Sequence, residues 1–319
     1  MNNGNSMDLE ALGKAKTYMG DFAWPTVLLG SGLFAGYLAT PLLVVAGYLP
    51  LLPAMALIAI MTYLAYTVLH ESVHGTISGG HSSLRWVNDL MGYLAGWMIM
   101  IPLTAHRHEH LAHHRHTNDP EQDPDFIVSR FRRTPWRAVT LAMQILKGQF
   151  AFYIDRRWSR GPRRQDVILC LEVLAALAPR IAFLAAGYWV EGLALFLVAW
   201  SIGVTVLMFL FAYIVHSPHE TEGRFVDTST ILVPGGALGK VITVAWVYQN
   251  YHSIHHLFPR VPFYRYPALF NDIEDIMVAS GAPIYRLGWR GLVRDDFTFL
   301  PTEEPSRETA PKASLSALG

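Results

Sequence analysis

The chain alternates between long apolar runs and polar segments that hold most of its charges and histidines. Four runs approach or exceed the length of a membrane-spanning helix, at 24–48, 51–69, 168–190 and 193–215. Among them only 168–190 contains charged residues, Glu172 and Arg180. A helix needs roughly 20 apolar residues to cross a bilayer. The pattern therefore predicts four transmembrane helices.

Two further apolar runs do not meet this requirement. Residues 87–103 form a shorter run that includes Asp89, which predicts an interfacial or re-entrant helix. Residues 225–247 are only moderately apolar, are interrupted by Pro-Gly-Gly at 234–236, and carry Lys240. We therefore do not expect this second run to cross the membrane.

The distribution of basic residues predicts the orientation. The segment 105–165, between the second and third spans, holds twelve Lys or Arg residues, and the short connections on the other side hold none. The positive-inside rule then places this segment and both ends of the chain in the cytoplasm. Residues 1–20 are polar and predict no cleaved signal peptide.

These features predict an all-α integral membrane fold at the inner, cytoplasmic membrane. We expect one domain over 1–301, with a cytoplasmic helical cap built from 70–165 and 216–301. Residues 302–319 are rich in Pro, Ser, Glu and Ala, which predicts a disordered tail. The composition agrees with a membrane protein, since 52% of the residues are hydrophobic and only 16% are charged.

Nine of the fourteen histidines gather beside the apolar runs, on the side predicted to be cytoplasmic. They form an H-x-x-x-H pattern, two H-x-x-H-H patterns and one single position, namely His70 and His74, His110, His113 and His114, His252, His255 and His256, and His216. Residues three and four apart share one face of a helix. Each cluster can therefore direct its imidazoles to one point.

Nine imidazoles are too many for one metal ion, because a zinc site uses about four ligands. Two metal ions with histidine-rich shells account for the number. The only cysteine, Cys170, lies inside an apolar run, so thiolate ligands are excluded. Several nearby polar residues are candidates to orient these ligands or a bound water: Asp119, Asp123, Asp125, Asn250 and His219. Three other histidines, His81, His106 and His108, are expected to be solvated or to lie beside the metal ligands, and His116, two residues after His114, stays open between a solvated position and a role at the site.

An all-histidine dinuclear site favours iron and O₂ chemistry. Such chemistry needs electrons, but the chain has no flavin, nicotinamide, haem or iron–sulfur motif. We therefore expect an external donor, such as a ferredoxin, on the cytoplasmic face. Eight arginines could attract an acidic donor, or could instead only set the membrane orientation and bind lipid headgroups: Arg130, Arg132, Arg133, Arg156, Arg157, Arg160, Arg163 and Arg164.

The three histidine clusters resemble those of the membrane fatty-acid desaturase and hydroxylase superfamily, over about residues 65–270. Two stretches are also similar to β-carotene hydroxylases of the cyanobacterial type, at 110–125 (HLAHHRHTNDPEQDPD) and 249–266 (QNYHSIHHLFPRVPFYRY). The resemblance implies two iron ions held by the nine clustered histidines. His216 matches the extra ligand after the fourth span, although nearby His219 has no counterpart and leaves that ligand open between the two.

From this resemblance we expect a di-iron oxygenase that hydroxylates an aliphatic C–H bond of a long apolar lipid, with a carotenoid ring as the leading substrate. A fatty-acyl desaturase or hydroxylase is the alternative, and an oxidative decarboxylase is a more distant one. A membrane metal transporter or a zinc hydrolase belongs to a different class. A transporter would place its ligands near the bilayer midplane, and a zinc hydrolase would need only three or four of them.

Overall fold

A computed structural model describes residues 3–132, 137–289 and 291–294 of the chain. The expected tail at 302–319 lies outside the described residues. Helices dominate, and four of them are long and apolar enough to cross a membrane. The all-α membrane fold predicted from the sequence is therefore confirmed. A small sheet, which the sequence analysis did not predict, adds to it.

The four candidate spans agree in number and order with the predicted runs. They are α2 (Trp24–Val45), α3 (Leu51–His74), α7 (Arg163–Ala185) and a composite helix over Trp189–His216. The composite helix comprises α8 (Trp189–Leu193), a π-helical turn (Ala194–Ala199), α9 (Trp200–Leu207), a second π-helical turn (Met208–Tyr213) and α10 (Ile214–His216). A polar first turn extends α7 to Arg163, before the predicted 168, whereas α2 and α7 end before the predicted 48 and 190.

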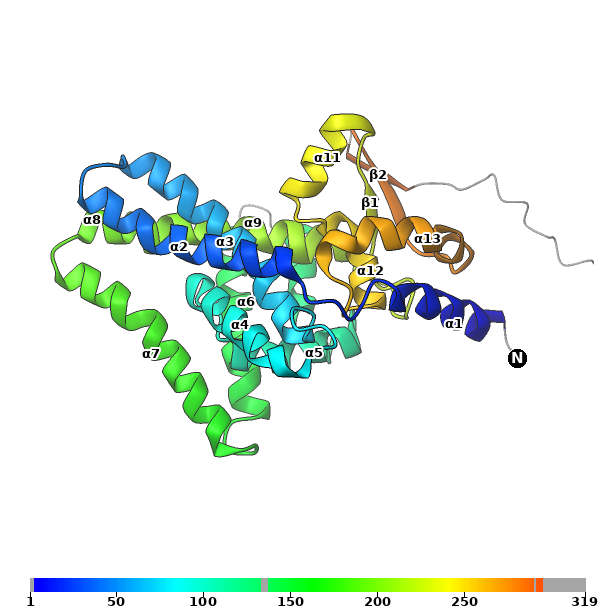
Figure 1. The fold of residues 1–319 in the computed structure, drawn as a ribbon, viewed down its shortest axis with the longest axis horizontal. Helices are drawn as coiled ribbons and strands as arrows, with labels where there is room; N and C mark the ends of the chain where they lie inside the picture. The colour runs from blue at the N-terminus through cyan, green and yellow to red at the C-terminus, as the bar shows by residue number, and fades with distance from the viewer. Residues whose placement is uncertain (1–2, 133–136, 290, 295–319) are drawn as a thin grey trace, which may run out of the picture.

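Close packing joins α3 to α9. A Cβ placed on Gly203 of α9 would lie 2.5 Å from the carbonyl oxygen of Ala59 on α3, so only glycine fits there. Small residues of this kind let helix backbones approach closely in a membrane, where dispersion contacts replace the hydrophobic effect. In contrast, α7 leans away from α2 and α3 (Figure 1), and it is the least buried of the four spans.

The segment 87–103, predicted to be an interfacial or re-entrant helix, is mainly the helix α4 (Arg85–Ile99), and a second short helix, α5 (Leu103–His116), follows it. The helix is interrupted between them at Met100, whose backbone is left-handed (φ 59°), and Pro102 directly precedes α5. This break allows α5 to turn its histidines towards the end of α3.

The two charged residues of α7 lie beside this break. Arg180 donates to the carbonyl oxygens of Trp97 and Met98 at the carboxyl end of α4, at 3.0 and 3.3 Å. The Glu172 carboxylate accepts from the backbone N–H of Thr104 in the first turn of α5, at 3.3 Å. Each charge therefore faces the helix end of opposite partial charge. This arrangement explains two charges that the hydrophobic pattern left unexplained.

The remaining elements form the cap around the histidine-bearing ends of the spans. They are α1 (Asn3–Lys16), η1 (Ser82–Leu84), η2 (Phe126–Arg132), α6 (Ala138–Arg156), α11 (Gly236–Ala245), η6 (Gln249–Tyr251), α12 (His252–Leu257), η7 (Phe263–Arg265) and α13 (Tyr266–Ala279). A sheet in the order β1-β2-β3 joins β1 (Thr230–Leu232) in parallel to β2 (Ile284–Gly288), which pairs antiparallel with β3 (Gly291–Arg294). As expected, 225–247 does not cross the membrane as one helix.

Candidate metal centre

Three helices and the end of the last span bring the nine clustered histidines together. His70 and His74 lie one turn apart at the carboxyl end of α3, which stops at Gly75 in a left-handed conformation. The second cluster lies on α5, the third forms most of the short helix α12, and His216 ends α10. Helical spacing of three and four residues places each cluster on one face, as the sequence predicts.

The imidazoles form two neighbouring groups. One consists of His70, His74, His110, His114 and His255. The other consists of His113, His216 and His256. Within each group the ring nitrogens lie within 4.8 Å of one another. His252 adjoins the second group, with its ring centroid 4.8 Å from the rings of both His216 and His256.

The hydrogen bonds around the second group leave unprotonated nitrogens facing one another. His113 Nδ1 lies 2.8 Å from the Asp123 carboxylate, and His216 Nδ1 lies 2.6 Å from the carbonyl oxygen of Ala212. Both acceptors require a proton on Nδ1, so each Nε2 keeps its lone pair. These two Nε2 atoms are 3.1 Å apart, and a third, from His256, lies 3.2 Å from that of His216. Converging lone pairs of this kind fit a metal cation.

The first group has the same character. Nε2 of His110 lies 3.0 Å from Nε2 of both His74 and His114, and Nε2 of His114 lies 2.9 Å from that of His255. Both ring nitrogens of His70 are buried without a protein partner. The donor set contains only imidazole nitrogens, which suit iron, zinc or copper. The described residues therefore fit two metal ions.

Burial keeps these imidazoles in the neutral form that binds metal. It lowers the pKa of five of them well below the ordinary value, and neighbouring imidazoles add to the effect: His110, His114, His252, His255 and His256. His113 differs. Burial alone would lower its pKa, but the adjacent Asp123 carboxylate raises the pKa above the ordinary value.

Asp123 and Asp125 have different roles in the structure. Asp123 is buried and contacts His113 directly, the kind of partner that fixes the tautomer of a ligating imidazole. Asp125 instead shares a hydrogen bond with the buried carboxyl of Glu109. Burial raises the pKa of Glu109 to about 7 and the pKa of Asp125 well above its usual range. This carboxyl pair thus holds a proton beside α5.

The structure separates the other candidates. Asp119 is at the surface, where its carboxylate accepts from the backbone N–H groups of Glu121 and Gln122, and among the described residues it makes no hydrogen bond to a clustered histidine. The Asn250 amide donates to the carbonyl oxygen of Ile231 and ties η6 to β1. His219 stacks at 6.3 Å on His216 but is in neither group. Of these two histidines, only His216 faces the other ring nitrogens.

Of the three histidines expected to be solvated or to lie beside the ligands, His81 is exposed and His108 is half-buried. His106 lies beside a candidate ligand. It is fully buried, stacks on His110 with centroids 5.1 Å apart, and has Nδ1 3.1 Å from Oε1 of Gln149. It lies on α5 outside both groups, where it packs against His110, and Gln149 links it to α6. Its amide partner is too far away in the sequence for local spacing to identify it.

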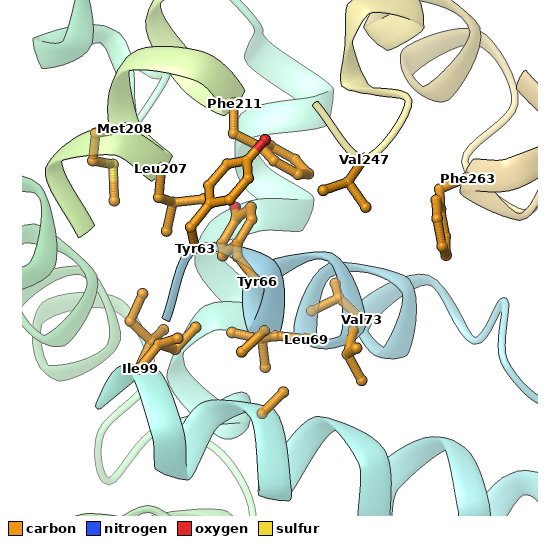
Figure 2. Close-up of a cluster of buried hydrophobic side chains, with 14 of the residues drawn as sticks. Tyr63, Tyr66, Leu69, Val73, Ile99, Leu207, Met208, Phe211, Val247 and Phe263 are labelled. Atoms are coloured by element: carbon orange, nitrogen blue, oxygen red, sulfur yellow. The ribbon is translucent and has the colours of Figure 1, made fainter. Parts of the chain in front are cut away.

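An apolar wall borders the two groups. Tyr66 stacks on His70 with centroids 5.6 Å apart, and Phe211 lies 5.0 Å from His70 and 5.6 Å from His252. Figure 2 shows these two rings close together with Tyr63 and Leu207, between α3 and the last span. The sequence analysis missed this wall. One signal was available, because Tyr66 lies one helical turn before His70 and shares its face.

Two hydrogen-bond partners of the third cluster were also missed. Oε1 of Gln249 lies 2.9 Å from Nδ1 of His252, and the Tyr266 hydroxyl lies 3.1 Å from Nδ1 of His255. Gln249 precedes His252 by one turn, so spacing could have identified it. Tyr266 belongs to α13 and reaches the cluster only through the tertiary fold.

Comparisons with known proteins find similarity to fatty acid desaturases and conjugases. The family described as Fatty acid desaturase matches residues 46–288. The chain is 27% identical over 274 residues to an sn-1 oleoyl-lipid 12-desaturase of a Picosynechococcus strain, covering 79% of this chain and 76% of that protein. It is 24% identical to the fatty acid conjugase FAC2 A of Calendula officinalis, with 77% and 78% covered. It is also 24% identical to a chloroplastic sn-2 acyl-lipid omega-3 desaturase (ferredoxin) of Helianthus annuus, with 74% and 60% covered.

Proposed function

Because the chain belongs to the fatty acid desaturase family and is an O₂-dependent oxidoreductase, we propose that it is a di-iron enzyme that desaturates an acyl chain of a membrane lipid. The observation that carries the proposal is the pair of neighbouring, buried imidazole groups at the ends of the spans. The proposed iron ligands are the nine clustered histidines, with His252 completing the second group beside His113, His216 and His256.

The substrate proposal revises the leading interpretation of the sequence. That interpretation favoured a carotenoid ring, because 110–125 and 249–266 are similar to β-carotene hydroxylases. The relatives found by comparison are instead named as acyl-lipid desaturases and fatty acid conjugases. An acyl chain is therefore the better-supported substrate, and a carotenoid becomes an outcome of the test.

The reaction defines what the protein must provide. Removing two hydrogens from neighbouring carbons while O₂ becomes two molecules of water consumes two electrons and two protons from outside. Two irons held by the imidazole groups would supply the O₂ activation. Burial holds most of these imidazoles neutral. Asp123, Gln249 and the Ala212 carbonyl fix the tautomers of His113, His252 and His216.

The apolar wall would receive the substrate. Phe211 contacts one ring near each group, His70 and His252, so a methylene lying against Phe211 would be close to both metals. Tyr66 packs edge to face on Phe211, with centroids 4.6 Å apart, and closes the same surface. The faces of these rings offer an acyl chain dispersion contacts, which suit an unactivated C–H bond.

Expression in two bacterial hosts tests the proposal, one with ordinary membrane lipids and one that makes β-carotene. We expect new double bonds in the fatty acids, detected by gas chromatography, and unchanged pigment. His256→Ala should abolish the product and His81→Ala should retain it, because His81 is exposed and belongs to neither imidazole group. Hydroxylated pigment with unchanged fatty acids would select the carotenoid substrate.

Metal analysis of the purified protein separates the remaining classes. Two irons per chain would support the di-iron proposal, and one zinc would support a hydrolase. The position of the clusters already disfavours a transporter, because they lie at the ends of spans or outside them and not along a path through the bilayer centre.

A further inference from the structure

The helix α11 presents an apolar face that no described part of the chain covers. Leu238, Val241 and Val244 are 61%, 64% and 57% exposed. They lie three residues apart along the helix and so share one side of it. Beside this face the helix is packed, since Ile242, like Leu210 and Leu287, packs against the buried cluster of Val215, Ile231 and Trp246. This helix therefore uses one face for the fold and leaves the other unpaired.

Two hydrogen bonds fix how far α11 reaches along the membrane spans. The Tyr63 hydroxyl of α3 donates to the carbonyl oxygen of Ala245, the last residue of α11, at 3.3 Å. Tyr63 lies eleven residues before the end of α3 at His74, which is about 16 Å at the helical rise. Nε1 of Trp246 donates to the carbonyl oxygen of Leu210, inside the last span, at 2.9 Å. The carboxyl end of α11 is therefore level with the apolar part of two spans.

A second exposed group lies beside this face. The side chain of Trp289, between β2 and β3, is fully exposed at 106% of its reference area. Figure 1 shows the β2–β3 hairpin next to α11, and Leu287 and Leu292 of the hairpin pack in the same cluster as Ile242. Exposed tryptophan is typical of the membrane–water interface, where its ring meets lipid and its N–H meets water.

Lys240 occupies the margin of the exposed face. At about 100° per residue, it lies roughly 100° from Val241 and on the edge of the arc that contains Leu238, Val241 and Val244. A lysine in this position can extend its amine towards phosphate groups while its methylenes stay in the apolar layer. The distribution of apolar, aromatic and basic groups is that of a helix lying in a lipid interface.

We propose that α11 and Trp289 form an interfacial membrane anchor, seated among the phospholipids of the leaflet next to the histidine clusters. The ten residues of α11 span about 15 Å, too short to cross a bilayer. The exposed face instead continues the lipid-facing surface of α3 and the last span. Because only Trp246, Val247 and Tyr248 separate α11 from η6 and α12, the anchor fixes the third histidine cluster relative to the membrane.

Site-directed labelling in liposomes tests the anchor without measuring the reaction, so it can fail independently of the proposed function. Cys170 is the only cysteine, and Cys170→Ala gives a background for single labels at Leu238→Cys, Val241→Cys and Lys240→Cys. The matched control is Asn271→Cys, on an exposed position of the cap helix α13. Each variant carries a polarity-sensitive fluorophore in the full-length protein, in vesicles of phosphatidylcholine with some phosphatidylglycerol.

We expect the labels at 238 and 241 to be quenched by lipids with a nitroxide near the ester end of the chain, and to be shielded from aqueous iodide. The label at 240 should show less lipid quenching than the one at 241, and the control should be quenched by iodide only. Equal iodide quenching at 241 and 271 would overturn the proposal. Shielding from both quenchers, with energy transfer between labelled chains, would also overturn it and assign the face to a second copy.

Discussion

Asp123 shows how one side chain outside the imidazole groups can control them. It accepts from Nδ1 of His113 at 2.8 Å and also from the backbone N–H of Asn118 at 2.9 Å. We expect Asp123→Asn to lower iron affinity about 10- to 100-fold, since a ligand histidine loses its charged partner. Competition with a graded series of chelators measures this. Asp119→Asn is the control, and equal iron retention by both variants would remove Asp123 from its orienting role.

At the level of residues, spacing predicted which histidines meet but not all that holds them in place. Positions three and four apart must share a helix face, so the membership of each cluster could be deduced from the sequence. The pairing across clusters, such as His114 with His255 at 2.9 Å, depends on how α5 and α12 pack. Partners such as Gln149 and Tyr266 come from helices whose positions only the tertiary fold determines.

At the scale of the helices, a buried charged side chain of α7, Arg180, stabilises the break between α4 and α5. Arg180 is buried and donates to carbonyl oxygens of Ala176, Trp97 and Met98. We expect Arg180→Met to destabilise the protein by on the order of 1–3 kcal/mol, because buried acceptors at the end of α4 lose their donor. Thermal unfolding followed by size-exclusion chromatography measures the loss.

Two comparisons make this test specific. Glu172→Gln keeps an oxygen that can accept from Thr104, so it should lower the unfolding temperature less than Arg180→Met. Arg163→Met removes an exposed arginine from the start of the same helix and should have little effect. If Arg180→Met unfolded at the same temperature as the wild type, the proposed role of Arg180 in capping α4 would be wrong.

Hydrophobic runs predicted the membrane helices well because burial in lipid depends on a local property, the absence of charge over about 20 residues. Their ends were less accurate, as α7 begins at Arg163 and not at the predicted 168. The sheet could not be predicted this way. β1 pairs with β2 through contacts such as Ile231 with Tyr285, which lie far apart in the sequence, and each strand is too short to show a clear alternation.

At the scale of the whole molecule, the proposed orientation places every histidine cluster on the cytoplasmic side. The reason is that 105–165 carries twelve basic residues, which resist translocation. Reporter fusions within 120–160 and after Pro218 should report the cytoplasm, and an insertion between Gly47 and Leu51 should report the opposite side. A cytoplasmic signal from the Gly47–Leu51 connection would contradict the four-span arrangement.

The electron supply also concerns the whole molecule, because the described residues and the sequence offer no second redox centre. We expect purified protein with substrate and O₂ to give at most one turnover when pre-reduced, and none with NADPH as the only addition. A ferredoxin with its reductase should sustain turnover. One relative carries "(ferredoxin)" in its name, which motivates this choice of donor. Repeated turnover with NADPH alone would reveal a redox centre in the chain.

The salt dependence of that sustained turnover identifies where the donor docks. Four arginines are exposed where α6 ends and α7 begins: Arg156, Arg160, Arg163 and Arg164. Exposed charge pairs are screened beyond about 10 Å at 0.1 M salt. If an acidic donor binds these arginines, the rate should fall severalfold as salt rises, and Arg163→Glu with Arg164→Glu should raise the donor KM while leaving kcat nearly unchanged. Figure 1 shows this corner extending away from α12. If neither salt nor the charge reversals change the rate, the donor docks elsewhere, on the part of the cap nearer the histidines. The arginines would then contact only lipid headgroups.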